Sequence, residues 1–179
     1  MGKAASDLAR RRFRETALPY LDDAYSLARW LVGSGADAED IVQEACLRAL
    51  QALEQTHVDQ PRAWLLKIVR NTAYSWLAKN RASAIVLAGG AEDVEAQASG
   101  LAPTTPGPEA ALIEAADRAS VAKAIDELPL PFKETLVMRE VNGLSYREIA
   151  AALGLPVGTV MSRLARARAL LVAKLGTPP

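Results

Sequence analysis

The chain has 179 residues, half of them apolar, and its 21 Lys and Arg residues balance 21 Asp and Glu residues. This length suits one domain or two small ones, and the apolar content excludes a chain that is disordered throughout. Few aromatic residues and the lack of alternating β-branched runs favour an all-α fold.

The N-terminal segment and the reactive residue types narrow the possible classes. Arg10, Arg11 and Arg12 precede no long apolar run, so we predict a cytoplasmic protein with neither a signal peptide nor a membrane span. The single cysteine, Cys46, excludes an internal disulfide and is expected on the apolar face of a helix. The lone His57 has no partner at metal-ligand spacing, and no phosphate-binding glycine loop or nucleophilic triad is present. We therefore expect no metal, no cofactor, no catalytic residue and no enzymatic activity.

Three helices are predicted in the N-terminal part of the chain. Apolar residues recur at helical spacing over 18–32, and Gly33 and Gly35 then end this first helix. Asp37 is expected to cap a second amphipathic helix, and Pro61 occupies the first position of a third. The three helices would form one small bundle.

A change of composition separates this bundle from a second domain. Residues 82–108 contain paired glycines, three prolines and a run of acids, which is typical of a linker. A helix is predicted over about 109–128, where Pro129 and Pro131 stop it, and another over 132–141. The predicted organisation is a domain at 1–81, a linker at 82–108 and a domain at 109–179.

The sharpest motif lies in the second domain. Ser145 and Glu148 form a capping box ahead of a short apolar helix, residues 154–156 make a tight turn, and Val157 opens a long basic helix. This is the spacing of a helix-turn-helix, whose second helix enters the DNA major groove by its N-terminal turns. Exposed donors suited to that role are Thr159, Ser162, Arg163 and Arg166. The opposite face is apolar and should pack on the preceding helices: Val160, Leu164, Ala167 and Leu171.

The charges are unevenly distributed along the chain. No acid occurs over 60–91 or from residue 149 to the end, although both stretches are basic, whereas 82–120 has six acids and one base. The first basic stretch also contains Trp64, Tyr74 and Trp76. Two separate contacts with a polyanion are therefore predicted, the first with side chains that can stack on exposed bases. Of the three aromatic residues, Tyr74 is the better candidate for stacking, and Trp64 is expected in the core.

The motif sequences resemble a known family. Leu-Ser-Tyr-Arg-Glu-Ile-Ala (144–150) and Gly-Leu-Pro-Val-Gly-Thr-Val-Met-Ser-Arg-Leu-Ala-Arg-Ala-Arg (154–168) resemble region four of an extracytoplasmic-function (ECF) bacterial sigma factor of the sigma-70 family. Asp-Ala-Glu-Asp-Ile-Val-Gln-Glu-Ala-Cys-Leu-Arg-Ala-Leu (37–50) and Pro-Arg-Ala-Trp-Leu-Leu-Lys-Ile-Val-Arg-Asn-Thr-Ala-Tyr-Ser-Trp-Leu (61–77) resemble region two. Two motifs in the right order are more specific than one helix-turn-helix.

The resemblance implies a promoter-specificity subunit of RNA polymerase. Its partners would be core polymerase, promoter DNA and an anti-sigma factor, and it would be monomeric when free. The residues expected to contact the upstream (minus-thirty-five) element are Arg147, Thr159, Ser162, Arg163 and Arg166. Those expected at the downstream (minus-ten) element are Arg62, Lys67, Arg70, Asn71, Tyr74, Lys79 and Arg81, with Asn71 near a flipped base. Those expected to bind core polymerase are Asp37, Glu39, Asp40, Gln43, Glu44 and Arg48.

Some features leave alternatives open. Met161, Ala165 and Arg147 differ from the residues usual in the family, so the preferred promoter sequence is not predicted. The acidic linker fits either the RNA path of polymerase or a plain solvated tether. Two other classes of protein also share the helix-turn-helix: a dimeric regulator that binds operator DNA without polymerase, and an interaction module held by an anti-sigma protein.

Overall fold

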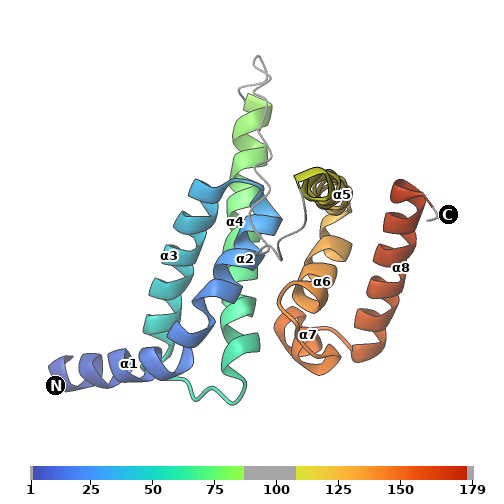
Figure 1. Cartoon of the computed structure of the whole chain (residues 1–179). Helices are drawn as coiled ribbons and strands as arrows, with labels where there is room; N and C mark the ends of the chain where they lie inside the picture. The colour runs from blue at the N-terminus through green and yellow to red at the C-terminus, as the bar shows by residue number, and fades with distance from the viewer. Residues whose placement is uncertain (1, 87–107, 177–179) are drawn as a thin grey trace.

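The computed structural model describes the backbone of residues 2–86 and 108–176, and the side chains of residues 7–80 and 117–176. Over these ranges the chain forms α-helices and one short 3-10 helix, with no strand, which confirms the all-α prediction (Figure 1). Most of the predicted linker, residues 87–107, lies outside the described residues. The elements are α1 (Gly2–Thr16), η1 (Leu18–Tyr20), α2 (Leu21–Val32), α3 (Gly35–Ala52), α4 (Pro61–Val86), α5 (Pro108–Asp126), α6 (Leu130–Glu140), α7 (Tyr146–Leu153) and α8 (Val157–Leu175).

The first half of the chain is a bundle of α2, α3 and α4, joined at one end by α1. Large apolar side chains from these three helices are fully buried: Leu27, Ile41, Leu65, Leu66 and Val69. Helix α1 was not predicted from the sequence. It buries Ala9, and Arg12 Nη1 donates a hydrogen bond to the Leu53 carbonyl oxygen at 2.9 Å. Figure 1 shows α1 extending from the base of the bundle.

The turn between α2 and α3 corrects the predicted cap. Gly33 adopts φ 82°, a left-handed conformation that favours glycine, and its N–H donates to the Arg29 carbonyl oxygen. The N-cap of α3 is Ser34, whose Oγ accepts a hydrogen bond from the Asp37 N–H at 3.4 Å. Asp37 was expected to be this cap, but it lies inside the first turn of α3. Gly35 begins α3 and does not help to end α2.

The second half contains the predicted helix-turn-helix. The capping box is present, because Glu148 N–H donates to Ser145 Oγ at 3.3 Å and Ser145 N–H donates to Glu148 Oε2 at 2.8 Å. Gly154 ends α7 at φ 66°. Proline placement differs from the prediction: α5 ends at Asp126, and Pro131 stands in the first turn of α6, where a missing N–H costs little. The apolar face of α8 buries Val160, Leu164 and Ala167, with Leu171 partly buried against the core.

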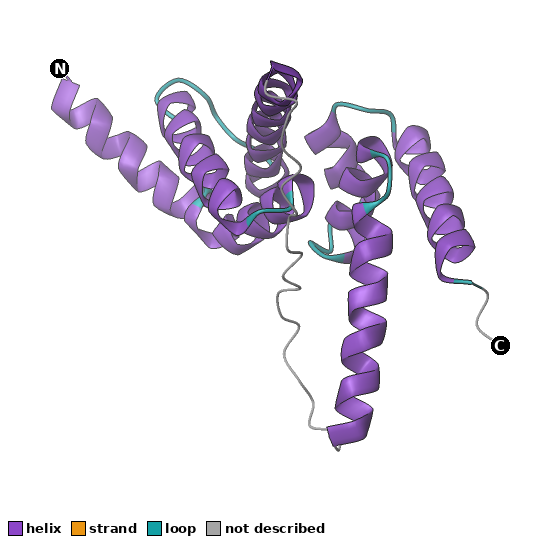
Figure 2. Cartoon of the chain, turned by 90° about the horizontal axis from the view of Figure 1, so that it is seen from above, coloured by secondary structure: helices purple, strands orange, loops and turns teal. Residues whose placement is uncertain are grey.

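The two halves pack against each other. Helix α6 contacts α2, and α7 contacts α4, and a single cluster of buried side chains runs through both halves. Figure 1 shows α6 and α7 beside the face formed by α2 and α4, and in Figure 2 α5 projects away from this assembly. Face-to-face packing therefore brings α4 and the helix-turn-helix together.

Removal of the capping hydroxyl should weaken the helix-turn-helix measurably. We expect Ser145→Ala to lower the free energy of unfolding by about 1 kcal/mol, because the Glu148 N–H at the start of α7 loses its acceptor. Urea unfolding followed by circular dichroism measures the change. Ser75→Ala is the control, since its exposed hydroxyl only bonds the Asn71 carbonyl oxygen of its own helix. Equal stability of Ser145→Ala and Ser75→Ala would contradict the role of the cap.

The capping box should also make stability depend on pH. Hydrogen bonds from the Ser145 side chain and backbone lower the pKa of Glu148. A carboxyl whose folded-state pKa is depressed contributes stability above its unfolded-state pKa of about 4.3, and that contribution is lost as the pH falls through the folded-state pKa. We expect the stability difference between the wild type and Glu148→Gln to shrink with acid. A constant difference from pH 7 to pH 3 in urea titrations would contradict this expectation.

Candidate nucleic-acid interface

The outward face of α8 carries the first group of predicted DNA-contacting residues. Ser162 and Arg166 are exposed, and Thr159 and Arg163 are half-buried. Arg166 makes no ion pair within the described part of the chain, whereas Arg168, two residues on, pairs with Glu140 at 2.7 Å. Arg147 is exposed on α7. The first turns of α8 therefore present donors to solvent while the opposite face of the helix is buried, as a recognition helix requires.

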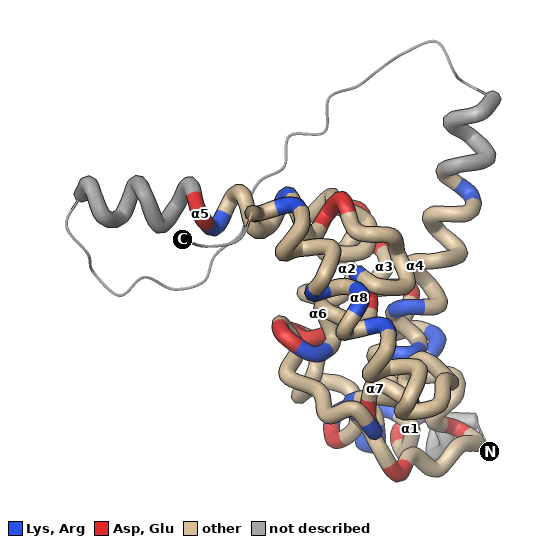
Figure 3. The backbone as a smooth tube through the Cα atoms, turned by 90° about the vertical axis from the view of Figure 1, so that its right-hand side faces the viewer, with Lys and Arg blue, Asp and Glu red and all other residues tan. Residues whose placement is uncertain are grey.

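The second group of predicted DNA-contacting residues divides into two along α4. Lys67, Asn71 and Lys79 are exposed, and basic residues gather along α4 and α8 in Figure 3. Arg62, Arg70 and Tyr74 are instead half-buried where the two halves of the chain meet. Arg81 belongs to α4, but its side chain lies outside the described residues.

A shallow hollow separates the exposed parts of α3 and α4. Its volume is about 350 Å³, and its lining residues are Arg48, Ala52, Trp64, Lys67, Ile68 and Asn71. Trp64 packs partly against the core, as expected, and also borders this hollow. Because Lys67 and Asn71 are four residues apart in a helix, they lie on the same face of α4. A cation, an amide and an aromatic ring therefore meet at one concave surface.

The buried carboxylate of Glu134 is hydrogen-bonded to three of the half-buried residues, Arg70, Tyr74 and Arg163. Glu134 of α6 has no exposed surface, and its oxygens accept hydrogen bonds from Arg70 Nε at 2.8 Å, from Tyr74 Oη at 2.8 Å and from Arg163 Nη1 at 3.1 Å. The Arg70 guanidinium also lies 4.1 Å from the Tyr74 ring centroid. Burial, followed by the hydrogen bond to Glu134, raises the pKa of Tyr74 to about 12. Tyr74 thus remains a neutral hydrogen-bond donor at physiological pH.

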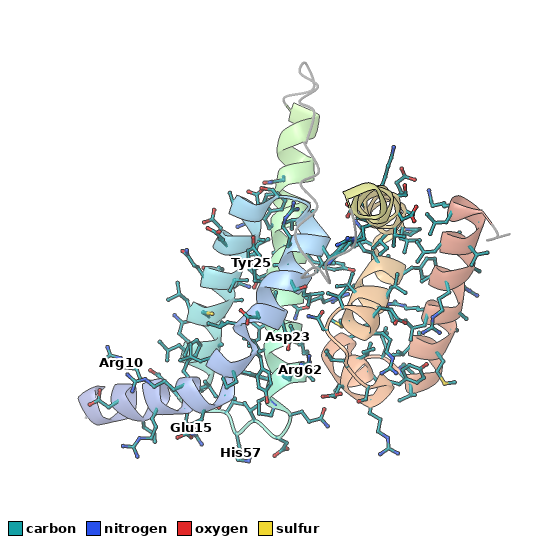
Figure 4. The ribbon with its side chains drawn as sticks, in the orientation of Figure 1. Arg10, Glu15, Asp23, Tyr25, His57 and Arg62 are labelled. Carbon is teal, nitrogen blue, oxygen red and sulfur yellow. The ribbon has the colours of Figure 1, made fainter. Side chains whose placement is uncertain are left out.

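A second polar contact holds the halves together near the start of α4. Arg62 Nε pairs with Asp23 Oδ2 of α2 at 2.7 Å (Figure 4). The Arg62 guanidinium also donates to the Asn142 carbonyl oxygen. Asn142 is buried, and its Nδ2 donates to the Asp23 carbonyl oxygen at 3.1 Å. The hydrogen bond to Asp23 outweighs the effect of burial and raises the pKa of Arg62. Arg62 therefore stays charged while its donors point into the protein.

Helix α3 presents the predicted acidic surface away from these contacts. Glu39, Asp40, Gln43 and Glu44 are exposed, and Arg48 Nε pairs with Glu44 Oε1 at 2.8 Å. Asp37 is half-buried beside the Ser34 cap. The opposite side of α3 packs against α1, α2 and α4. This acidic face is therefore open to a partner with a basic surface.

Comparison with known proteins decides the family. The sigma-70 region 2 family model matches residues 17–83, and the sigma-70 region 4 model matches residues 118–171. The ECF RNA polymerase sigma-E factor of Escherichia coli K12 is 36% identical over 162 residues, covering 88% of this chain and 83% of the relative. The chain belongs to the ECF family of RNA polymerase sigma factors. It therefore directs core RNA polymerase to promoters at transcription initiation, and sigma factors of this kind are initiation factors without enzymatic activity.

Further similarities agree with this assignment. The ECF sigma factor SigE of Mycolicibacterium smegmatis is 31% identical over 154 residues, covering 86% of this chain and 58% of the relative. Among solved structures, the sigma factor RpoE of Bartonella quintana, in complex with the anti-sigma factor NepR, has a TM-score of 0.73 at 25% identity, covering 94% of this chain and 99% of that one. CnrH, in complex with the cytosolic domain of CnrY, has a TM-score of 0.64 at 26% identity, covering 96% and 92%.

Three further features of the sigma factor concern membrane spans, metal ligands and the reactive residues Cys46 and His57. No described helix is both long and apolar enough to span a membrane. Among the described residues, no three His, Cys, Asp or Glu side chains are placed so that they could hold a metal ion. Cys46 is half-buried on α3, and burial raises the pKa of its thiol. His57 is exposed in the loop before α4, 3.3 Å from Asp59.

Four residues at these surfaces were not singled out from the sequence of the sigma factor. Glu134, Asp23 and Asn142 join the two halves, and Leu47 is 58% exposed between Glu44 and Arg48 on the acidic face of α3. For Leu47 the signal was present, since it lies outside the apolar stripe of its helix. Glu134 had no such signal, since it lies between Lys133 and Thr135 in the sequence of α6. Nothing local identified Asp23 and Asn142, whose roles depend on a contact across 119 residues.

Proposed function

We propose that α8 reads the upstream promoter element through Thr159, Ser162, Arg163 and Arg166, with Arg147 of α7 beside them. The observation that carries this proposal is Arg166, which is exposed, makes no ion pair with another described residue, and lies on the outward face of a helix whose opposite face is buried. Arginine can donate two hydrogen bonds to a guanine edge in the major groove. We assign no DNA contact to Arg168, because it forms an ion pair with Glu140.

The proposed downstream surface is the exposed face of α4. Lys67 and Lys79 neutralise phosphates there, and Asn71, at the edge of the hollow on α3 and α4, contacts an unstacked base. The proposed surface also includes Arg81 and, once the two halves separate, Arg62, Arg70 and Tyr74, which are half-buried between the halves in this structure. Binding the single strand better than the duplex supplies the free energy that opens the promoter, a few kcal/mol per flipped base. This role needs binding alone, so we assign no catalytic residue.

The proposed site for core polymerase is the acidic face of α3, formed by Asp37, Glu39, Asp40, Gln43, Glu44 and Arg48. Complementary charges steer association and fix its register. We add Leu47, because a leucine that is 58% exposed within a charged surface is a candidate hydrophobic anchor.

An anti-sigma factor is the proposed regulatory partner. This proposal draws on two similar proteins: the sigma factor RpoE, solved in complex with the anti-sigma factor NepR, and CnrH, solved in complex with the cytosolic domain of CnrY. We also place the sigma factor in the cytoplasm, where core polymerase and promoters are found.

The test is run-off transcription with purified bacterial core polymerase on DNA from upstream of the gene that encodes this chain. Protein-dependent initiation at a defined start site is expected. Operator binding as a dimer, without core binding or initiation, would contradict the proposal and indicate an autonomous regulator. Strong core binding without promoter-dependent initiation would show that the DNA-contacting roles are wrong.

A further inference from the structure

The contact between the two halves uses residues that promoter DNA would need. Arg70 and Tyr74 belong to the proposed downstream surface and Arg163 to the proposed upstream surface, yet all three donate to Glu134. Arg70 does so twice, through Nε at 2.8 Å and Nη2 at 3.3 Å. A guanidinium that holds a carboxylate with two donors has the geometry with which it would hold a phosphate.

Because Glu134 is fully buried, its hydrogen bonds to α4 are expected to form or break together. Glu134 is 0% exposed, and a buried carboxylate is tolerated only when charged or polar donors surround it. Arg70 and Tyr74 come from α4, across the contact between the halves, whereas Arg163 comes from α8 of the same half as Glu134. Separation of the halves would therefore expose Glu134 to water and free two donors of α4 at once.

The rest of the contact between the two halves also contains polar groups, which allow the halves to separate. Beside the apolar side chains, the halves are joined by Asn142 Nδ2 to Asp23 and by Arg62 to the Asn142 carbonyl oxygen. The Oδ1 atom of Asn142 is buried and has no hydrogen-bond partner in the described part of the chain. Contacts between domains of one chain that contain such polar groups generally permit relative motion of the domains.

We propose that the chain has a closed, self-blocking state, in which the Glu134 carboxylate occupies Arg70, Tyr74 and Arg163 in place of a nucleic-acid phosphate. This inference rests on the proposed DNA-contacting roles of those residues. The acids of α3 remain exposed in the closed state, so core polymerase can bind before the halves separate.

The closed state lowers the apparent affinity for DNA. For a ligand that binds only the open state, the apparent affinity equals the intrinsic affinity multiplied by the fraction of molecules that are open. Glu134→Gln removes the negative charge while nearly preserving the side-chain shape, and it leaves Arg70 and Arg163 facing each other without a counter-charge. We expect this variant to be more open and to bind a fluorescein-labelled single-stranded oligonucleotide of mixed sequence about tenfold more tightly.

The experiment measures the radius of gyration by small-angle X-ray scattering and oligonucleotide affinity by fluorescence anisotropy, on the full chain. Glu140→Gln is the matched control, because Glu140 is an exposed acid on the same helix that pairs with Arg168 within its own half. It should leave the radius of gyration unchanged. Tyr74→Phe is the second variant, since it removes one donor to Glu134 and retains the aromatic ring for stacking. It should shift both measurements in the direction of Glu134→Gln, by less, and it decides the question if Glu134→Gln does not fold.

The outcomes separate this inference from the function on which it rests. A larger radius of gyration with tighter oligonucleotide binding supports the closed state. An unchanged radius and affinity in both variants overturns it, while promoter-dependent transcription by the wild type would still support the proposed function. A larger radius with unchanged affinity also overturns it, because the residues held by Glu134 would then have no role in nucleic-acid binding.

Discussion

Arg166→Ala is expected to reduce promoter-dependent transcription by roughly 10- to 100-fold while leaving core binding unchanged. The side chain is exposed on the outward face of α8 and makes no ion pair among the described residues, so its removal disturbs nothing within the fold. Loss of one bidentate contact with a base costs about 1–3 kcal/mol, which corresponds to an effect of this size. Run-off transcription at subsaturating protein concentration measures it.

Arg168→Ala is the matched control for this prediction. It removes the same charge from the same helix, two residues away, but breaks only an exposed ion pair with Glu140. Such pairs contribute less than about 1 kcal/mol. Transcription by Arg168→Ala should therefore stay within a few fold of the wild type. If Arg166→Ala and Arg168→Ala were equally active, the proposed reading face of α8 would be wrong.

Charge reversal on α3 should have a comparably large effect on a different step. We expect Glu39→Lys combined with Asp40→Lys to weaken binding to core polymerase by on the order of 100-fold, because both acids are exposed and reversal turns attraction into repulsion. Titration of core polymerase with labelled sigma factor measures this affinity. Oligonucleotide binding by the free chain should not fall, since neither residue lies on the proposed DNA-contacting surfaces.

An equal change of net charge elsewhere is the control. Asp7→Lys combined with Glu15→Lys reverses two exposed acids on α1, where Figure 4 shows Glu15 on a helix separate from α3. If the α1 and α3 variants weakened core binding equally, general electrostatics and not the face of α3 would explain the effect. If neither weakened it, the proposed site for core polymerase would be wrong.

Local chemistry made much of the fold predictable. The Ser145–Glu148 capping box, the left-handed Gly33 and Gly154 and the Pro61 start of α4 depend on residues only a few positions apart, and all are present in the structure. The cap of α3 was assigned to Asp37 because Asp and Ser compete for this position and the local sequence contains both. Helix α1 was missed because its sequence is polar, and its packing depends on distant contacts such as that of Arg12 with Leu53.

The arrangement of the two halves could not be predicted, and it changes how the site is interpreted. Periodicity shows that α4 and α8 each have a basic face, but it carries no information on contacts between residues 64 positions apart, such as Arg70 and Glu134. Three of the seven residues predicted on α4, Arg62, Arg70 and Tyr74, are therefore engaged inside the molecule. The roles of Lys67, Asn71 and Arg166 remain predictions on exposed surfaces. Those of Arg70 and Tyr74 require the halves to separate, and that of Arg163 requires its guanidinium to leave Glu134 of its own half.

The central claim is that Arg70, Tyr74 and Arg163 bind Glu134 in the free sigma factor and promoter DNA in the holoenzyme. The most direct measurement is energy transfer between dyes placed on Gln55→Cys and Ala173→Cys, both exposed positions, in a Cys46→Ser background. We predict high transfer efficiency in the free chain and a clear fall when it joins core polymerase on promoter DNA. An efficiency that stayed as high in a transcriptionally active promoter complex as in the free chain would contradict the account.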